Sequence, residues 1–223
     1  MTVAFDAYTK SAVPVTGNFT FNHTPVGTPR AVLVFTCQGA SSNDVTGMSY
    51  GSLALTAVSG SPNTLTTGEL GNITCWFGGS GIPTGVQTIT AASGASSKVA
   101  YCITLTGAAD TEVVDSDGTI NSTSQANPSV TLSLSGRASF CAIGFEGGPD
   151  APTGVTPFAN WTARDETDPG LAILALYTYD TIGTADVSAG WTQVADDAVA
   201  IAVAVSEVIA GSPYYAYNQM MAA

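Results

Sequence analysis

The amino-acid sequence predicts an all-β protein, an antiparallel two-sheet β-sandwich of jelly-roll-like type with about 13–14 strands and essentially no helix. Three observations predict it. Apolar residues alternate with polar ones along most of the chain, and turn-forming Gly, Pro, Asn, Asp and Ser separate these segments. Hydrophobic residues make up 45% of the 223 residues, enough for a large core. Two stacked antiparallel sheets let each strand bury one face and leave the other polar.

The expected strands follow one another along the whole chain. In residues 30–37, Leu33, Phe35 and Cys37 share one face of the strand, and Val32 and Val34 share the other. Residues 98–105 and 129–134 alternate in the same way. Further strands are expected at 3–7, 17–22, 45–50, 52–58, 72–77, 85–91, 139–145, 158–163, 171–179 and 185–194.

The alanine-rich segment 197–206 distinguishes a strand from a helix. Val199, Ile201, Val203 and Val205 occupy every second position, and a helix would scatter them around its circumference. In a strand they form one β-branched face, while the alanines form a flat opposite face. That flat face allows close packing against a second sheet or a neighbouring subunit.

The sequence indicates one sandwich domain over residues 1–211 and a C-terminal tail over residues 212–223. No repeat of fixed period is present, and the polar segments 106–128 and 146–157 are expected to be long loops. The tail carries large side chains that we expect to dock on a neighbouring subunit or on a particle surface. The alternative is that the tail folds back on its own sandwich. These interface candidates are Tyr214, Tyr215, Tyr217, Met220 and Met221.

The charge composition excludes two classes of partner. Five Lys and Arg against seventeen Asp and Glu give a net charge of −12. Nucleic acids and anionic membranes require a basic surface, so we expect neither as a partner. No apolar run reaches the roughly 18 residues of a membrane helix, and the N-terminus resembles no signal peptide.

The four cysteines lie far apart and inside apolar segments. Their spacing does not match that of a zinc site, so we expect buried free thiols at Cys37, Cys75, Cys102 and Cys141. A disulfide between neighbouring strands, such as Cys102 with Cys141, is the alternative.

One motif suggests a serine nucleophile but lacks a partner for it. Gly47 to Gly51 match the GxSxG pattern around Ser49. The only histidine of the chain, His23, lies upstream, and Ser49 sits between two strand-like segments rather than before a helix. We therefore expect no hydrolase activity and no enzyme of another class.

Two groups of acidic residues have the chemistry of a site. Asp110, Glu112, Asp115 and Asp117 could supply oxygen ligands to calcium, although a solvated acidic loop is the expected state. A carboxylate pair for glycoside hydrolysis would come from four acidic residues, of which the last three lie near Trp161 in the sequence, and solvated turns are again expected. We expect no cofactor and no bound metal. The carboxylate candidates are Glu146, Asp165, Glu166 and Asp168.

Trp76, Trp161 and Trp191 are expected to be core or sheet-face aromatics. A tryptophan exposed at a sandwich edge would instead indicate contact with a carbohydrate or a receptor.

Five short motifs carry a resemblance to a known family. They are VTGMSYGSLALT at 45–56, TCWF at 74–77, GVQTIT at 85–90, KVAYCI at 98–103 and the Gly190-Trp191 pair before the last strand. These motifs resemble those of the β-sandwich proteins in tailed-phage virions. The resemblance covers roughly residues 17–209 and departs from the pattern in the two long loops and the tail.

This resemblance implies a virion component, either a capsid decoration (cement) protein, a head fibre or a tail-associated fibre module. Such a protein is made in the host cytoplasm and acts as a homo-oligomer, for instance a trimer, on the major capsid protein or another virion protein. The alternative function is a carbohydrate- or receptor-binding sandwich that uses loops 106–128 and 146–170.

Overall fold

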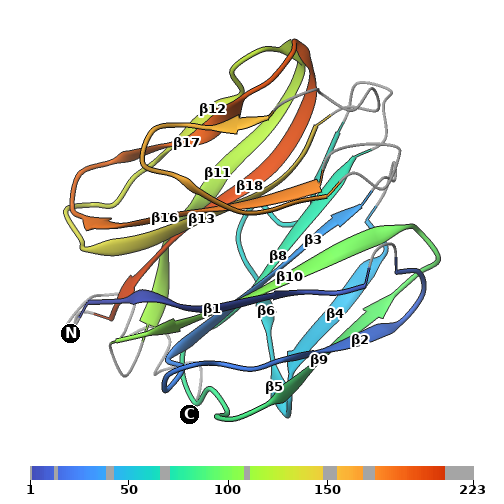
Figure 1. The fold of residues 1–223 in the computed structure, drawn as a ribbon, viewed down its shortest axis with the longest axis vertical. Coiled ribbons are helices and arrows are strands. Elements are labelled where there is room, and N and C mark those ends of the chain that lie inside the picture. Colours follow the sequence, from blue (N-terminus) through green and yellow to red (C-terminus); the bar gives the residue numbers. More distant parts are fainter. Residues whose placement is uncertain are drawn as a thin grey trace.

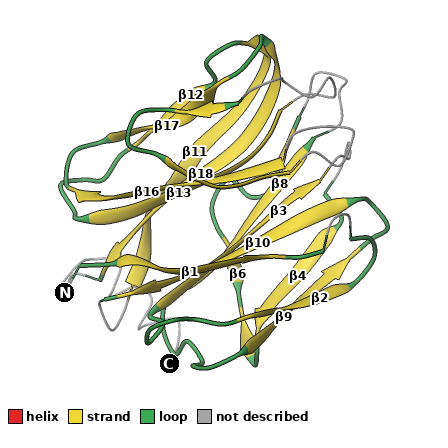
Figure 2. Ribbon diagram, viewed as in Figure 1, coloured by secondary structure: helices red, strands yellow, loops and turns green. Residues whose placement is uncertain are grey.

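The strands in the described part of the protein are arranged in four antiparallel sheets (Figure 1). The computed structural model describes residues 2–12, 15–38, 43–65, 71–107, 111–147, 155–167 and 174–208. Over these residues the chain forms strands, turns and loops, and no helix (Figure 2). Fourteen of the strands have four or more residues, so the predicted all-β sandwich and its strand number are confirmed.

The first half of the chain, residues 2–107, forms two of these sheets. The larger sheet has the order β1-β10-β3-β8-β6, with β7 also paired to β8, and the smaller has the order β2-β9-β4-β5. The strands are β1 (Ala4–Lys10), β2 (Phe19–His23), β3 (Ala31–Gln38), β4 (Val45–Tyr50), β5 (Leu53–Ala54), β6 (Thr56–Ala57), β7 (Asn63–Thr64), β8 (Asn72–Gly78), β9 (Gln87–Ser93) and β10 (Lys98–Thr106).

The second half, residues 111–208, forms the other two sheets. Their orders are β11-β18-β13-β16-β15 and β12-β17-β14. The strands are β11 (Thr111–Gln125), β12 (Ser129–Leu132), β13 (Ser139–Gly147), β14 (Thr156–Pro157), β15 (Thr162–Thr167), β16 (Leu174–Gly183), β17 (Val187–Thr192) and β18 (Asp196–Glu207).

The two halves have the same strand order. β1-β10-β3-β8 in the first half corresponds to β11-β18-β13-β16 in the second, and β2-β9-β4 corresponds to β12-β17-β14. Each half is therefore a jelly roll, in which consecutive strands alternate between two sheets. The sequence, in which no fixed period was found, did not reveal this duplication.

The two jelly rolls differ by one short strand. In both halves a strand lies at the edge of the larger sheet, β6 beside β8 and β15 beside β16, but only in the first half does a described strand, β5, first pair with β4 in the smaller sheet. The chain in the second half therefore returns to the larger sheet directly after β14.

The four sheets enclose three apolar layers rather than the single one of a two-sheet sandwich. The central core lies between the two larger sheets and includes Leu33, Phe35, Ile201 and Val203. One outer core lies inside the first half, with Val32 and Val34 on its β3 side. The other lies inside the second half, between β13, β16 and β18 and the smaller sheet. Strands β3 and β13 are consequently buried on both faces.

The alternation in β18 is confirmed in detail. Val199, Ile201, Val203 and Val205 face the central core. The alanines from Ala198 to Ala204 face the outer core of the second half and pack towards its smaller sheet. Of the two occupants expected for the flat alanine face, the structure shows a sheet of the same chain.

The two larger sheets approach each other closely at one glycine. A Cβ atom on Gly144 of β13 would lie 2.6 Å from Cδ1 of Phe35 on β3, so only glycine leaves room for this ring. The Tyr101 hydroxyl donates a hydrogen bond across the same layer to the Leu174 carbonyl, at 2.8 Å. The two jelly rolls thus share one continuous core.

Three sequence-based predictions of secondary structure were wrong. Most of the expected loop 106–128 is the strand β11, paired along its length with β18. This strand lies at the edge of its sheet, where polar side chains can face water, and three register shifts interrupt the pairing. The expected strand 158–163 begins only at Thr162, and 52–58 is split into β5 and β6.

Two further predictions fall largely outside the described residues. Of the expected loop 146–157, the structure describes the end of β13 and residues 155–157, which include β14. The tail, 212–223, with Tyr214, Tyr215, Tyr217, Met220 and Met221, lies outside the described residues altogether.

Candidate functional site

Ser49 and His23 do not form a catalytic pair. Both nitrogens of the fully buried His23 ring have hydroxyl partners, Thr9 Oγ1 at 3.1 Å and Thr104 Oγ1 at 3.0 Å. The ring packs against Tyr50, which is next to Ser49 on β4 and therefore faces the other side of the sheet. Burial lowers the His23 pKa to about 4, against an opposing effect of Asp6, so the imidazole is neutral at pH 7.

All four cysteines are free and buried, as predicted. Burial raises the pKa of each thiol, which leaves the unreactive protonated form. The alternative disulfide is wrong, because Cys102 lies in the outer core of the first half and Cys141 in that of the second.

The acidic calcium candidates lie on a strand and not in a coordinating loop. Glu112 forms an ion pair with Arg137 at 2.6 Å, and Asp115 accepts a hydrogen bond from the Ser133 backbone at 2.6 Å. Asp110 lies outside the described residues, and the side chain of Asp117 is not described. Within the described ranges, no three His, Cys, Asp or Glu side chains come together as metal ligands.

The carboxylates considered for glycoside hydrolysis are kept apart by the fold. Asp165 forms an ion pair with Lys10 at 2.9 Å, whereas its neighbour Glu166 accepts a hydrogen bond from the Tyr177 hydroxyl at 2.6 Å. Neighbouring residues on a strand face opposite sides, so these two cannot flank one bond. Glu146 is buried on β13, and Asp168 lies outside the described residues.

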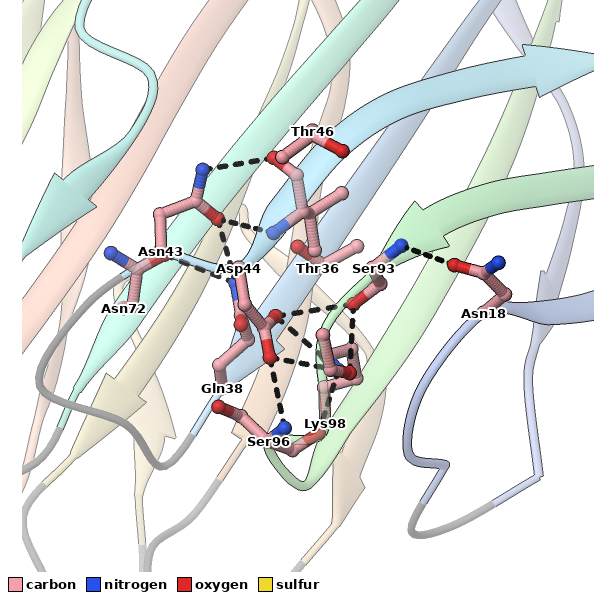
Figure 3. A network of polar contacts seen from close by, with 12 residues as sticks. Asn18, Thr36, Gln38, Asn43, Asp44, Thr46, Asn72, Ser93, Ser96 and Lys98 are labelled. Atoms are coloured by element: carbon pink, nitrogen blue, oxygen red, sulfur yellow. Dashed lines mark hydrogen bonds and ion pairs between the residues drawn. The ribbon is translucent and has the colours of Figure 1, made fainter.

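A polar network at one end of the first jelly roll surrounds a buried lysine (Figure 3). The Lys98 side chain is fully buried, and its ammonium group donates to the carbonyls of Ser96 at 2.6 Å and Gly94 at 3.1 Å. The third partner of the ammonium group is Asp44, whose Oδ1 lies 3.3 Å from Lys98 Nζ. Burial opposes ionisation of Asp44, but hydrogen bonds from Ser96 and Ser93 and the charge of Lys98 outweigh it and lower its pKa.

This network is structural rather than a binding site. An ammonium group has three donors, and each has an acceptor here. Asn43 closes the adjacent turn by bonding both the amide and the carbonyl of Val45, and it accepts from Gln38 at 3.1 Å. The groups are thus occupied by one another, which fixes the ends of β3, β4 and β10.

The network continues into the second jelly roll through a buried carboxyl group. Gln38 donates to the side chain of Asn72 at 3.1 Å, and the Asn72 backbone amide donates to Glu146 Oε2, also at 3.1 Å. Burial raises the Glu146 pKa well above its usual value, against the opposing hydrogen bond from Asn72. Glu146 Oε1 and Gln38 Oε1 are buried without a hydrogen-bond partner among the described residues.

Within the described part of the chain, a cleft in the second jelly roll is a candidate for a binding site. It has a volume of about 440 Å³, within the range of roughly 300–1,000 Å³ for small-molecule sites. Two connections between the sheets border it: the turn 158–161, which leads from β14 to β15, and residues 184–186, which lead from β16 to β17.

Aromatic rings form the apolar part of the cleft. Trp161 is nearly buried, donates its indole N–H to the Ser188 carbonyl at 3.0 Å and lies 5.5 Å from the Tyr179 ring. Phe158 and Tyr179 are half-buried. A hydrogen bond from the Trp161 backbone amide to the Phe158 carbonyl closes the turn. Asn160 adopts the positive φ of 72° that this turn requires.

The polar part of the cleft is exposed and carries no cation. Asn160, Thr184, Asp186 and Ser188 line it, and all four are exposed. Of these, Asp186 Oδ1 accepts a hydrogen bond from the Leu134 amide at 2.9 Å. The side chains of Asn160, Thr184 and Ser188 have no hydrogen-bond partner in the described part of the chain.

The sequence analysis found only part of this cleft. It placed Trp161 in the core or on a sheet face, which is confirmed for Trp161 and for Trp191, which stacks on Phe145 at 3.9 Å. Asn160, Tyr179 and Asp186 were not recognised as neighbours. The Gly183–Asp186 segment between two alternating strands was the one available signal, since it marks a connection between sheets.

Comparison with known proteins finds no match: no family model, no characterised protein and no solved structure is similar to this chain. Among the described residues, no helix is long and apolar enough to span a membrane.

Proposed function

We propose that the protein is a non-enzymatic structural component of a tailed-phage virion, on the particle exterior as a capsid decoration (cement) protein or head fibre. The observation that carries this proposal is the pair of jelly rolls joined through one continuous core. Viral capsid proteins are one of the main classes that use jelly rolls. The motifs at 45–56, 74–77 and 85–90 resemble virion β-sandwich proteins and support the same class.

The chemistry of the described residues supports a role without catalysis. The thiols are buried, His23 is neutral and engaged on both nitrogens, and Ser49 has no base beside it. The net charge of −12 keeps the protein soluble and disfavours adhesion to the packaged genome. The expected partners are other copies of the chain and the major capsid protein.

The test is the location of the protein on purified particles. Mass spectrometry of purified virions should detect the chain, and antibody labelling of unopened particles should place it on the outside. Purified protein added to particles that lack it should bind them. Absence of the chain from purified particles, or labelling only after the particles are opened, would contradict the proposal.

The tail provides a second variant for the same assay. Deletion of residues 212–223 should leave the thermal melt nearly unchanged and weaken self-association in sedimentation, or binding to particles. A truncated protein that binds normally would show that Tyr214, Tyr215, Tyr217, Met220 and Met221 do not form the docking arm.

The second candidate function is a carbohydrate- or receptor-binding module, because lectins are another class with jelly-roll folds. The aromatic and polar cleft beside Trp161 is the observation that favours it.

A further inference from the structure

The two jelly rolls carry different side chains on the connections between their sheets. In the first half, the chain passes from β5 to β6 through Leu55, which is buried in the outer core together with Ile82 of the β8–β9 connection. Leu55 and Leu53 also pack on Gly78 of β8, where a Cβ atom would meet their methyl groups at 2.9 and 3.1 Å. Aliphatic side chains therefore fill the space between these connections.

The corresponding place in the second half is the cleft. The turn 158–161 and residues 184–186 are the equivalents of the Leu55 and Ile82 connections, but they carry aromatic and polar residues. Gly183 lines the cleft, and a Cβ atom on it would meet no atom within 4 Å. The cleft is thus open space at a position that the first half closes.

We infer that this cleft binds a neutral saccharide. A pyranose ring has an apolar C–H face and a rim of hydroxyl groups, which are both donors and acceptors. Half-buried Phe158 and Tyr179 offer aromatic surface for the apolar face. Asn160, Thr184 and Ser188 offer amide and hydroxyl groups for the rim.

The negative charge at the cleft favours neutral saccharides over acidic ones. Among the described residues that line the cleft, Asp186 is the one that carries a charge, and the chain as a whole has a net charge of −12. A uronate or a sialylated sugar would bring a second negative charge beside Asp186 without a cation to neutralise it. The ligand class is therefore neutral hexoses and N-acetylhexosamines, and acidic sugars are excluded.

The inference deepens the second candidate function and does not rest on the virion location. A saccharide cleft is tested on the purified full-length chain, whereas the location is tested on particles. Failure of one therefore leaves the other unaffected.

The experiment uses an array of neutral and acidic oligosaccharides, followed by titration of the best neutral glycan with heteronuclear NMR detection. Gly183→Leu should fill the cleft, and Tyr179→Ala should remove an aromatic wall. Each should weaken binding at least tenfold. Gly47→Ala is the matched control, because a Cβ atom there meets only Ala92 at 3.7 Å on the opposite half of the molecule.

The expected result is binding of neutral glycans by the wild-type chain and by Gly47→Ala, with chemical-shift changes at Trp161 and Asn160. Thermal melts of the Gly183 and Tyr179 variants establish that they are folded. If Tyr179→Ala does not fold, the test depends on Gly183→Leu alone. Three results would overturn the inference: no neutral glycan bound by the wild type, preference for acidic glycans, or unchanged affinity in folded Gly183→Leu.

Discussion

The two jelly rolls share a topology but differ at the connections between their sheets. Leu55 and Ile82 close the first half, whereas Phe158, Asn160 and Asp186 leave the second open. The corresponding strands β3 and β13 have different sequences, AVLVFTCQ and SFCAIGFEG, and both are buried on both faces. The comparison teaches that the same topology forms from different sequences as long as these central strands can be buried on both faces, while the connections can vary and acquire a site.

The shared central core makes the strongest test of whether the halves are one unit. Phe35→Ala should lower the free energy of unfolding by about 3–5 kcal/mol, because it removes the ring that packs on Gly144 across the two sheets. Urea unfolding followed by the summed fluorescence of the three tryptophans, Trp76 in the first half and Trp161 and Trp191 in the second, should give one transition. Two transitions, of which only one shifts, would show that the halves unfold separately.

The closed and open connections should respond differently to small substitutions. Leu55→Ala should cost about 2–5 kcal/mol, because it leaves a cavity in the outer core of the first half. Gly183→Ala should change stability by less than about 1 kcal/mol, because its Cβ atom enters open space and its φ is not positive. Equal losses in urea denaturation would contradict the difference between the two connections.

Acid sensitivity should arise in the first half, which holds the only histidine. Unfolded histidine titrates near pH 6.5, whereas the pKa of His23 in the fold is about 4. As the pH falls, the histidine of the unfolded chain gains a proton before that of the folded chain does. The contribution of neutral His23 to the free energy of unfolding is therefore fully present above pH 6.5 and is lost as the pH falls towards 4. Compared with His23→Gln, the wild type should lose about 2–3 kcal/mol over this range. Parallel pH profiles of the two proteins would refute the prediction.

The junction between the halves should show the opposite pH dependence. Burial raises the Glu146 pKa, so the fold keeps a proton that the unfolded chain releases above about pH 4.5. Its stabilising effect is present below that pH and decreases as the pH rises. Glu146→Gln keeps an acceptor for the Asn72 amide and should be more stable than wild type by about 1–3 kcal/mol at pH 8. Thermal melts at pH 4.5 should show nearly equal stability for wild type and Glu146→Gln. An equal difference in stability at pH 4.5 and pH 8 would count against a buried neutral carboxyl.

The smallest effect is expected at the rim of the interface between the halves. Lys10 of β1 and Asp165 of β15 form an ion pair at 2.9 Å, but the Lys10 side chain is 40% exposed. Lys10→Ala should therefore cost less than about 1 kcal/mol in urea denaturation, and less still in high salt. A loss as large as that of Phe35→Ala would mean that the rim, and not the core, holds the halves together.

The strands with strong alternation were predictable because burial imposes a period of two on the sequence. Leu33, Phe35 and Cys37 on one face of β3, and the valine and alanine faces of β18, are the clearest cases. The edge strand β11 was not predictable, because polar side chains at a sheet edge have the composition of a loop. Of the cleft, only Trp161 was singled out in advance, and its neighbours were missed.

The sequence by itself determined the all-β class, the buried thiols and the direction that most strands face. These follow from local patterns, since each side chain either meets water or does not. Only the tertiary structure decided that the strands form two jelly rolls in tandem, that Glu146 bridges them and that the cleft lies in the second. Such features depend on residues far apart in the chain, such as Asn72 with Glu146, 74 positions apart, or Phe35 with Gly144, 109 positions apart. Alternation specifies which face of a strand is buried, but not which other strand covers it.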